Sequence, residues 1–167
     1  MAGMSKDLSV FLVDDDQMYL MSLKNELSQR FKNIRLRTFL SGEDCIKHMN
    51  EKPDIIVIDY RLADDSTNAM NGVEVMKQIK SISKDNEVII ISGQDKLDVV
   101  INAIKNGAAE YIPKTENTYQ RLHSVLKNSI SNLKLFRTNR QYMIGNLVVA
   151  TMLLIFLTIM IWYYLIH

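Results

Sequence analysis

DIIVID, residues 54–59, contains four consecutive apolar residues and ends in a carboxylate, and this pattern indicates the fold class. A strand with one wet face alternates apolar and polar residues, whereas the four residues from Ile55 to Ile58 do not alternate. EVIIIS, residues 87–92, has the same character. Unbroken apolar runs of this length are typical of central strands in a parallel sheet that is covered on both faces.

Three further apolar runs are predicted to be strands, and segments with helical spacing separate them. The additional strands are SVFLV (9–13), IRLRTF (34–39) and EYIP (110–113). Helical apolar stripes lie within residues 20–31, 76–82, 97–104 and 122–133. Strands and helical stripes therefore alternate along most of the chain, which predicts an α/β fold with helices on both faces of the sheet.

Polar side chains stand where these predicted strands end. Ligand sites in such sheets lie beyond the carboxyl ends of the strands. The residues found there are Asp14, Asp15 and Asp16, then Asp59, Ser92 and Lys114. We therefore expect one crevice that gathers carboxylates, a hydroxyl and an ammonium.

Clustered carboxylates raise each other's pKa unless a cation lies among them. Mg²⁺ accepts oxygen ligands and typically takes only a few carboxylates. Asp14, Asp15 and Asp59 are the predicted ligands. Asp16 immediately precedes a helical stripe, so we expect its side chain to cap that helix.

An ammonium and a hydroxyl beside these carboxylates suit an anion larger than a carboxylate. A phosphoryl group carried on Asp59 would meet the metal, Ser92 and Lys114 together, which is the electrostatic arrangement of phosphoryl transfer. Asp59 is then the nucleophile. Asp59, Lys114 and Ser92 are the predicted catalytic residues.

Four motifs carry a resemblance to a known family. They are VFLVDDD (10–16), PDIIVIDY (53–60), VIIISGQ (88–94) and AAEYIPK (108–114). Together they resemble the receiver domain of two-component response regulators, in register from about Leu8 to Lys134. The resemblance implies a flavodoxin-like, doubly wound sheet of five parallel strands in the order 2-1-3-4-5.

The resemblance also implies a function. A histidine kinase or a phosphotransfer protein would donate the phosphoryl group to Asp59, with Mg²⁺ required. The backbone carbonyl of Arg61 would join Asp14, Asp15 and Asp59 as a metal ligand. Ser92 and Tyr111 would form the switch, the ring of Tyr111 turning inward as the Ser92 hydroxyl moves toward the phosphoryl group.

The chain departs from the family's pattern at two places. Thr115 follows Lys114 where the family usually has proline, so Lys114 is expected to be held differently. The loop RLADDSTNAMNG (61–72) is longer than usual, lacks the customary proline and carries Asp64 and Asp65.

The C-terminal segment has another character. Residues 141–166 contain no Asp, Glu, Lys or Arg, and 147–166 are almost entirely apolar. Twenty helical residues reach about 30 Å, the thickness of a bilayer's hydrocarbon core. A buried helix of a soluble protein is the alternative, but such helices keep a polar stripe and this one has none.

The flanking charges predict an orientation. Lys127, Lys134, Arg137 and Arg140 precede the apolar segment and only His167 follows it, which indicates a cytoplasmic N-terminal side. The predicted organisation is a receiver domain (1–134), a juxtamembrane extension of the last helix (135–142) and a transmembrane helix (143–167). We expect a single-pass membrane protein with a C-terminal anchor and its receiver domain in the cytoplasm.

Composition and residue spacing limit which partners the chain can have. The single cysteine, Cys45, excludes an intramolecular disulfide, and a net charge of +1 argues neither for nor against nucleic acid. No DNA-binding module follows Lys134, so output is expected through an unknown protein target at the membrane. Apolar positions from Tyr119 to Phe136 form either a homodimer seam or the face that packs on the sheet.

Three functional classes remain in view. The chain is expected to be no enzyme beyond catalysing its own phosphorylation and dephosphorylation. A receiver-like membrane scaffold would lack some of the five site residues, and none is missing. A metal-dependent aspartyl-phosphate phosphatase would need a second acidic group two residues after Asp59, where Arg61 stands.

Overall fold

The computed structural model describes residues 7–62, 70–94 and 97–166. Its centre is a parallel sheet of five strands in the order β2-β1-β3-β4-β5, which confirms the predicted flavodoxin-like topology. The strands are β1 (Leu8–Val13), β2 (Ile34–Phe39), β3 (Ile55–Asp59), β4 (Glu87–Ser92) and β5 (Glu110–Pro113). Every residue of β1 and β3 is buried, and so is every residue of β4 after Glu87. The unbroken apolar runs of β3 and β4 predict this burial.

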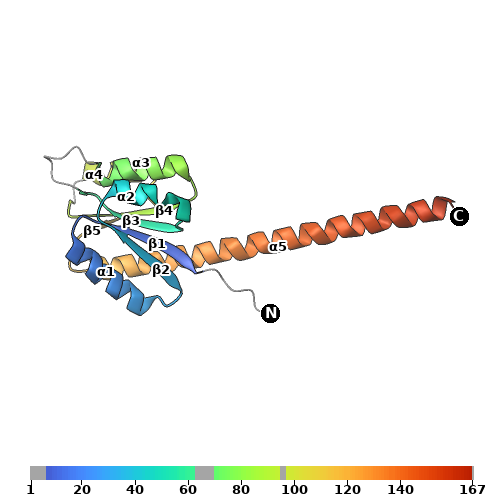
Figure 1. Cartoon of the computed structure of the whole chain (residues 1–167), viewed down its shortest axis with the longest axis horizontal. Coiled ribbons are helices and arrows are strands. Elements are labelled where there is room, and N and C mark those ends of the chain that lie inside the picture. Colours follow the sequence, from blue (N-terminus) through green and yellow to red (C-terminus); the bar gives the residue numbers. More distant parts are fainter. Residues whose placement is uncertain (1–6, 63–69, 95–96, 167) are drawn as a thin grey trace. The chain divides into compact units, whose positions relative to one another are not determined.

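Helices cover both faces of the sheet (Figure 1). They are α1 (Gln17–Arg30), α2 (Gly42–Lys47), the 3₁₀ turn η1 (Met49–Glu51), α3 (Gly72–Ile82), α4 (Leu97–Lys105) and α5 (Thr118–Ile166). One face of the sheet, including Phe11 and Ile56, forms a core cluster with Val75 and Met76 of α3. On the opposite side, α1 and the first turns of α5 cover the sheet (Figure 1).

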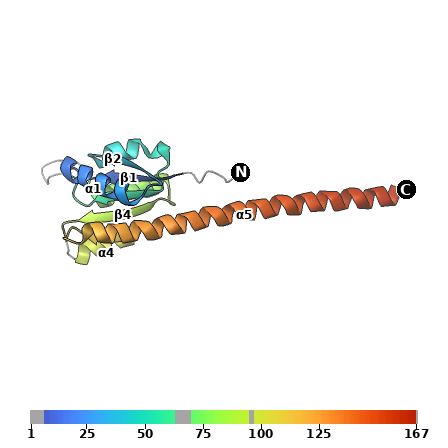
Figure 2. The ribbon, with the colours of Figure 1, turned by 90° about the horizontal axis from the view of Figure 1, so that it is seen from below.

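The chain divides into two compact units, residues 1–127 and 128–167. Helix α5 begins in the first unit and ends in the second as one element of 49 residues (Figure 2). Within the first unit Leu122 and Leu126 are fully buried. Those two positions therefore belong to the packing face of the receiver and are not open to a homodimer seam.

Helix α4 confirms a predicted helix, and three residues of its apolar stripe are exposed. Leu97, Ile101 and Ile104 are between 41% and 70% exposed, and the helix buries Ala103 instead. The helix ends as its sequence predicts, because Gly107 adopts a φ of 100°, a conformation that glycine takes without a Cβ clash.

Gly72 is required at the start of α3 because the chain passes very close to the end of β3. Its N–H donates to the carbonyl of Tyr60 at 2.8 Å. A Cβ at this position would lie 2.3 Å from the carbonyl oxygen of Asp59 and 2.9 Å from the Cα of Tyr60. Backbone atoms cannot move aside as a flexible side chain can, so the contact admits only glycine.

We expect Gly72→Ala to lower the free energy of unfolding by about 3 kcal/mol through overpacking. Urea denaturation of the full chain followed by circular dichroism measures this loss. Gly93→Ala is the matched control, since a Cβ there meets nothing within 4 Å, and it should change stability by less than about 1 kcal/mol. Equal losses in both variants would contradict the steric argument.

Candidate active and metal site

Strand register gathers the predicted site residues at one edge of the sheet. β1 pairs with β3, β3 with β4, and β4 with β5, all in parallel. Asp59 is the last residue of β3 and Ser92 the last of β4, whereas Asp14 and Lys114 directly follow β1 and β5. Side chains far apart in the sequence thus share the carboxyl edge.

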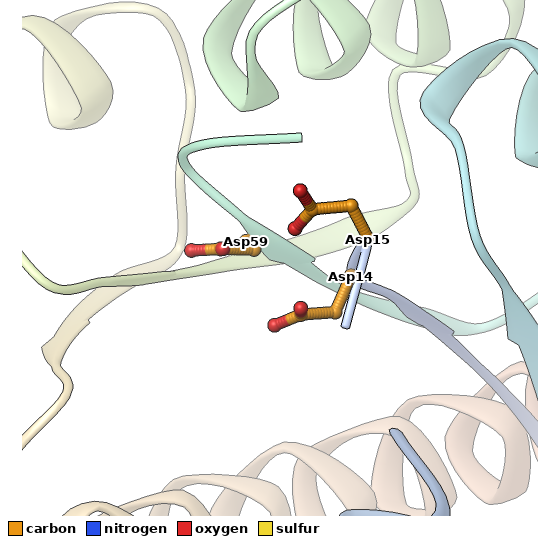
Figure 3. Close-up of side chains that lie close together, drawn as sticks. All are labelled: Asp14, Asp15 and Asp59. Carbon is orange, nitrogen blue, oxygen red and sulfur yellow. The ribbon is translucent and has the colours of Figure 1, made fainter. Parts of the chain in front are cut away.

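Three carboxylates turn toward one space from the ends of β1 and β3 (Figure 3). One oxygen of each of Asp14, Asp15 and Asp59 lies within 4.8 Å of the other two. Asp14 and Asp59 are 3% and 7% exposed, while Asp15 is exposed to solvent. The site therefore has a buried pair of carboxylates and one ligand open to water.

Lys114 joins the buried pair. Its Nζ donates to Asp14 Oδ2 at 2.8 Å and to Asp59 Oδ2 at 2.9 Å. The backbone N–H of Lys114 donates to the carbonyl of Ser92 at 2.6 Å, which attaches the start of the following loop to β4. One ammonium thus stands against two buried carboxylates.

Burial controls the protonation of this cluster. It raises the pKa of Asp59 to about 6, although the hydrogen bond from Lys114 acts in the opposite direction. Burial likewise raises the pKa of Asp14 above its usual value. For Lys114 burial lowers the pKa, but the hydrogen bonds to Asp14 and Asp59 outweigh it and leave the pKa above its usual value. The cluster is short of positive charge.

The donor set fits Mg²⁺. Three carboxylate oxygens at close range are hard ligands of the kind this ion prefers, and the exposed Asp15 leaves room for the waters it retains. A divalent cation among them would also relieve the buried negative charge. The N–H of Arg61 donates to the Asp59 carboxylate; that its carbonyl is a metal ligand stays a prediction.

Asp16 has the role that its position predicted. Its Oδ1 accepts from the N–H groups of Met18 at 2.8 Å and Tyr19 at 3.0 Å, and so caps α1. The N–H of Asp16 in turn donates to Asp14 Oδ1 at 2.9 Å. The third aspartate therefore serves the helix and helps to orient the first.

Ser92 and Tyr111 meet through Gln94. The Ser92 hydroxyl oxygen accepts from the Gln94 N–H at 3.0 Å, and the Tyr111 hydroxyl donates to the Gln94 carbonyl at 2.5 Å. Ser92 and Tyr111 are 1% and 6% exposed, so the ring of Tyr111 lies inside. The structure joins the two predicted switch residues, and their part in switching stays a prediction.

Thr118 is a residue of this site that the sequence reasoning missed. The bond between Lys114 and Thr115 is trans, and Thr115 keeps an N–H that proline would lack. That N–H donates to Thr118 Oγ1 at 2.6 Å, and the Thr118 proton is shared by the carbonyls of Pro113 at 2.9 Å and Thr115 at 2.7 Å. The absence of proline after the lysine was the available signal, because it leaves a donor to satisfy.

The long loop after Asp59 is described only at its ends. Residues 63–69, with Asp64 and Asp65, lie outside the described part of the chain. Beyond them Asn71 caps α3 together with Glu74 in a capping box, which anchors the end of the loop.

Comparison with known proteins agrees with this geometry. The family described as response regulator receiver domain matches residues 10–127. The chain belongs to this family. The structure matches a crystal structure of a response regulator receiver domain protein from Clostridium thermocellum with a TM-score of 0.66 and 26% identity, covering 77% of this chain and 98% of that one.

Two curated relatives show the range of proteins that contain such a domain. The chemotaxis protein CheY of Thermotoga maritima is 30% identical over 105 residues, which are 63% of this chain and 83% of the relative. The DNA-binding transcriptional regulator NtrC of Proteus hauseri is 32% identical over 107 residues, 64% of this chain but 21% of the relative. Across the first three relatives matched, the chain spans between 21% and 58% of their length.

Receiver domains of this family typically bind Mg²⁺ at an acidic site and interact with histidine kinases or phosphotransfer proteins. They are usually cytoplasmic. In this receiver domain, the acidic site corresponds to the cluster of Asp14, Asp15 and Asp59. Membership of this family thus explains why carboxylates are buried together here and why a cation is expected among them.

We expect Asp15→Asn to weaken Mg²⁺ binding at least about tenfold, because it removes one of few anionic ligands. Isothermal titration of the full chain with MgCl₂ measures the effect. Asp16→Asn is the neighbouring control, since asparagine also caps helices and Asp16 is engaged with α1; its affinity should equal that of the wild type. Equal weakening by both substitutions would contradict the assignment of Asp15 and Asp16 to different roles.

Proposed function

We propose that this receiver domain accepts a phosphoryl group on Asp59 from a histidine kinase or a phosphotransfer protein. The observation that carries the proposal is the contact of Lys114 Nζ with both Asp14 and Asp59 in a pocket short of positive charge. A carboxylate beside a fixed ammonium and a cation-binding cluster is placed to act as a nucleophile toward a phosphoryl donor.

The transfer breaks one bond and forms one. An Asp59 carboxylate oxygen attacks phosphorus, the P–N bond of the donor phosphohistidine breaks, and its electron pair remains on the imidazole. Negative charge then spreads over the phosphoryl oxygens. Lys114 Nζ is positioned to donate to one of them, and among the described residues the Ser92 hydroxyl accepts from the Gln94 N–H and donates to no partner, so its proton is available. Bound Mg²⁺ would supply the remaining positive charge.

The chain then acts as a signal rather than as an enzyme for other substrates. Its chemistry is confined to gaining and losing its own phosphoryl group. The Ser92 hydroxyl oxygen accepts from the Gln94 N–H, and the Gln94 carbonyl accepts from the Tyr111 hydroxyl. A turn of the Ser92 hydroxyl toward a phosphoryl oxygen would therefore be transmitted through Gln94 to Tyr111. This short path supports a switch that alters the surface around β4, α4 and β5 for a protein target.

We further propose that the C-terminal part of α5 anchors the domain in a membrane. An 18-residue window of this helix has a mean hydropathy of 2.5 with none of it buried. The stretch without charged residues, 141–166, is long enough to cross about 30 Å of hydrocarbon. The basic residues before it support a cytoplasmic receiver that signals through protein contacts at the membrane.

The test of the phosphoryl proposal is incubation of the full chain with Mg²⁺ and acetyl phosphate. We expect an acid-stable, base-labile label on the wild type and on Asp16→Asn, and none on Asp59→Asn, because the nucleophile is absent. Phosphate-affinity electrophoresis measures the label. An unlabelled wild type would favour a scaffold, and steady hydrolysis of small phosphomonoesters would favour a phosphatase.

The anchor is tested by comparing the full chain with a chain that ends at Arg140. The full chain should sediment with membranes and resist carbonate extraction, whereas the shorter chain should remain in the supernatant. Labelling of the shorter chain by acetyl phosphate serves as the control for an intact receiver. Carbonate release of the full chain, or sedimentation of the shorter one, would overturn the anchor.

A further inference from the structure

The ammonium of Lys114 has a third neighbour that is not charged. The Nζ lies 4.5 Å from the centroid of the Tyr19 ring, in addition to its contacts with Asp14 and Asp59. At that distance the negative face of an aromatic ring attracts a cation. Tyr19 lies on α1, and its N–H donates to the capping carboxylate of Asp16, so the helix start that follows the aspartates also places the ring.

A second ring supports the first. Tyr119, in the first turn of α5, stacks on Tyr19 with centroids 6.1 Å apart and an interplanar angle of 30°. The Tyr119 hydroxyl lies 3.3 Å from Ser22 Oγ on α1, which ties the two helices together at this level. The ring of Tyr19 thus contacts both the Tyr119 ring and the Lys114 ammonium.

The hydroxyl of Tyr19, unlike its ring, is buried without a hydrogen-bond partner among the residues that the structure describes. Burial also raises the pKa of Tyr19 to about 12, so the side chain is neutral at physiological pH. A buried hydroxyl without a partner costs stability. The feature of Tyr19 that the site uses is therefore the ring face.

We propose that Tyr19 is a positioning residue for Lys114, its ring holding the ammonium over the site through a cation–π contact. This inference rests on the proposed phosphoryl transfer to Asp59. The two carboxylates that hold Lys114 are themselves predicted to change partners when the site is loaded. A ring carries no formal charge and binds neither metal nor phosphate, so its hold on the ammonium persists while those of Asp14 and Asp59 change.

The position of Lys114 is testable without any phosphoryl chemistry. In carbon–proton NMR spectra of the full chain in detergent micelles, without Mg²⁺, the Hε protons of Lys114 should be shifted upfield by the ring current of Tyr19. Loss of the signal in Lys114→Arg assigns it. Tyr19→Phe should keep the upfield shift, and Tyr19→Leu should lose it. A wild-type signal at the ordinary lysine position would overturn the proposal, even if Tyr19→Leu failed to fold.

The consequence for the reaction is measured with acetyl phosphate and Mg²⁺. Tyr19→Leu should slow labelling of Asp59 about fivefold, the equivalent of losing a cation–π contact of modest strength, and Tyr19→Phe should restore the wild-type rate. Unfolding midpoints of both variants separate this effect from a loss of fold. Equal rates for leucine and phenylalanine would overturn the proposal, whereas a wild type that takes no label would refute the proposed function and leave the NMR result to judge the contact.

Discussion

Two buried carboxylates share one ammonium, and the site depends on that imbalance. Asp14 and Asp59 are buried at the carboxyl edge of the sheet, where ionised groups are poorly solvated. Lys114 compensates only one of their two charges. Such a cluster is stable either with a proton retained or with a further cation bound. Burial of this cluster raises the pKa of Asp59, and Asp15 adds a third carboxylate close to the pair.

The surrounding backbone makes this crowding possible. The order β2-β1-β3-β4-β5 sets β1 beside β3, so the residues at their carboxyl ends lie close together. Gly72 lets α3 start directly against the end of β3, which fixes the strand that carries Asp59. On the other side of the pocket, Thr118 closes the loop after Lys114 through hydrogen bonds where the family usually relies on proline.

Much of the fold and of the site was predictable because both rest on local patterns. Unbroken apolar runs mark buried parallel strands, and polar residues directly after them must lie at one edge. Asp16 was recognisable as a cap from its place before a stripe. The apolar stripe of α4 did not show which side of the helix is buried, since its leucine and isoleucines are exposed and Ala103 faces the core. Spacing reports a helix but not which side of it meets the sheet.

The five strands, the residues at their ends and the apolar segment near the C-terminus could be predicted from sequence alone, because periodicity and strand ends are properties of neighbouring residues. The three-dimensional packing was needed to show that the ring of Tyr19 lies against the Lys114 ammonium and that Tyr119 stacks on Tyr19. Such contacts depend on how helices α1 and α5 pack on one face of the sheet. Packing is set by the shapes of distant side chains together, which no local pattern encodes.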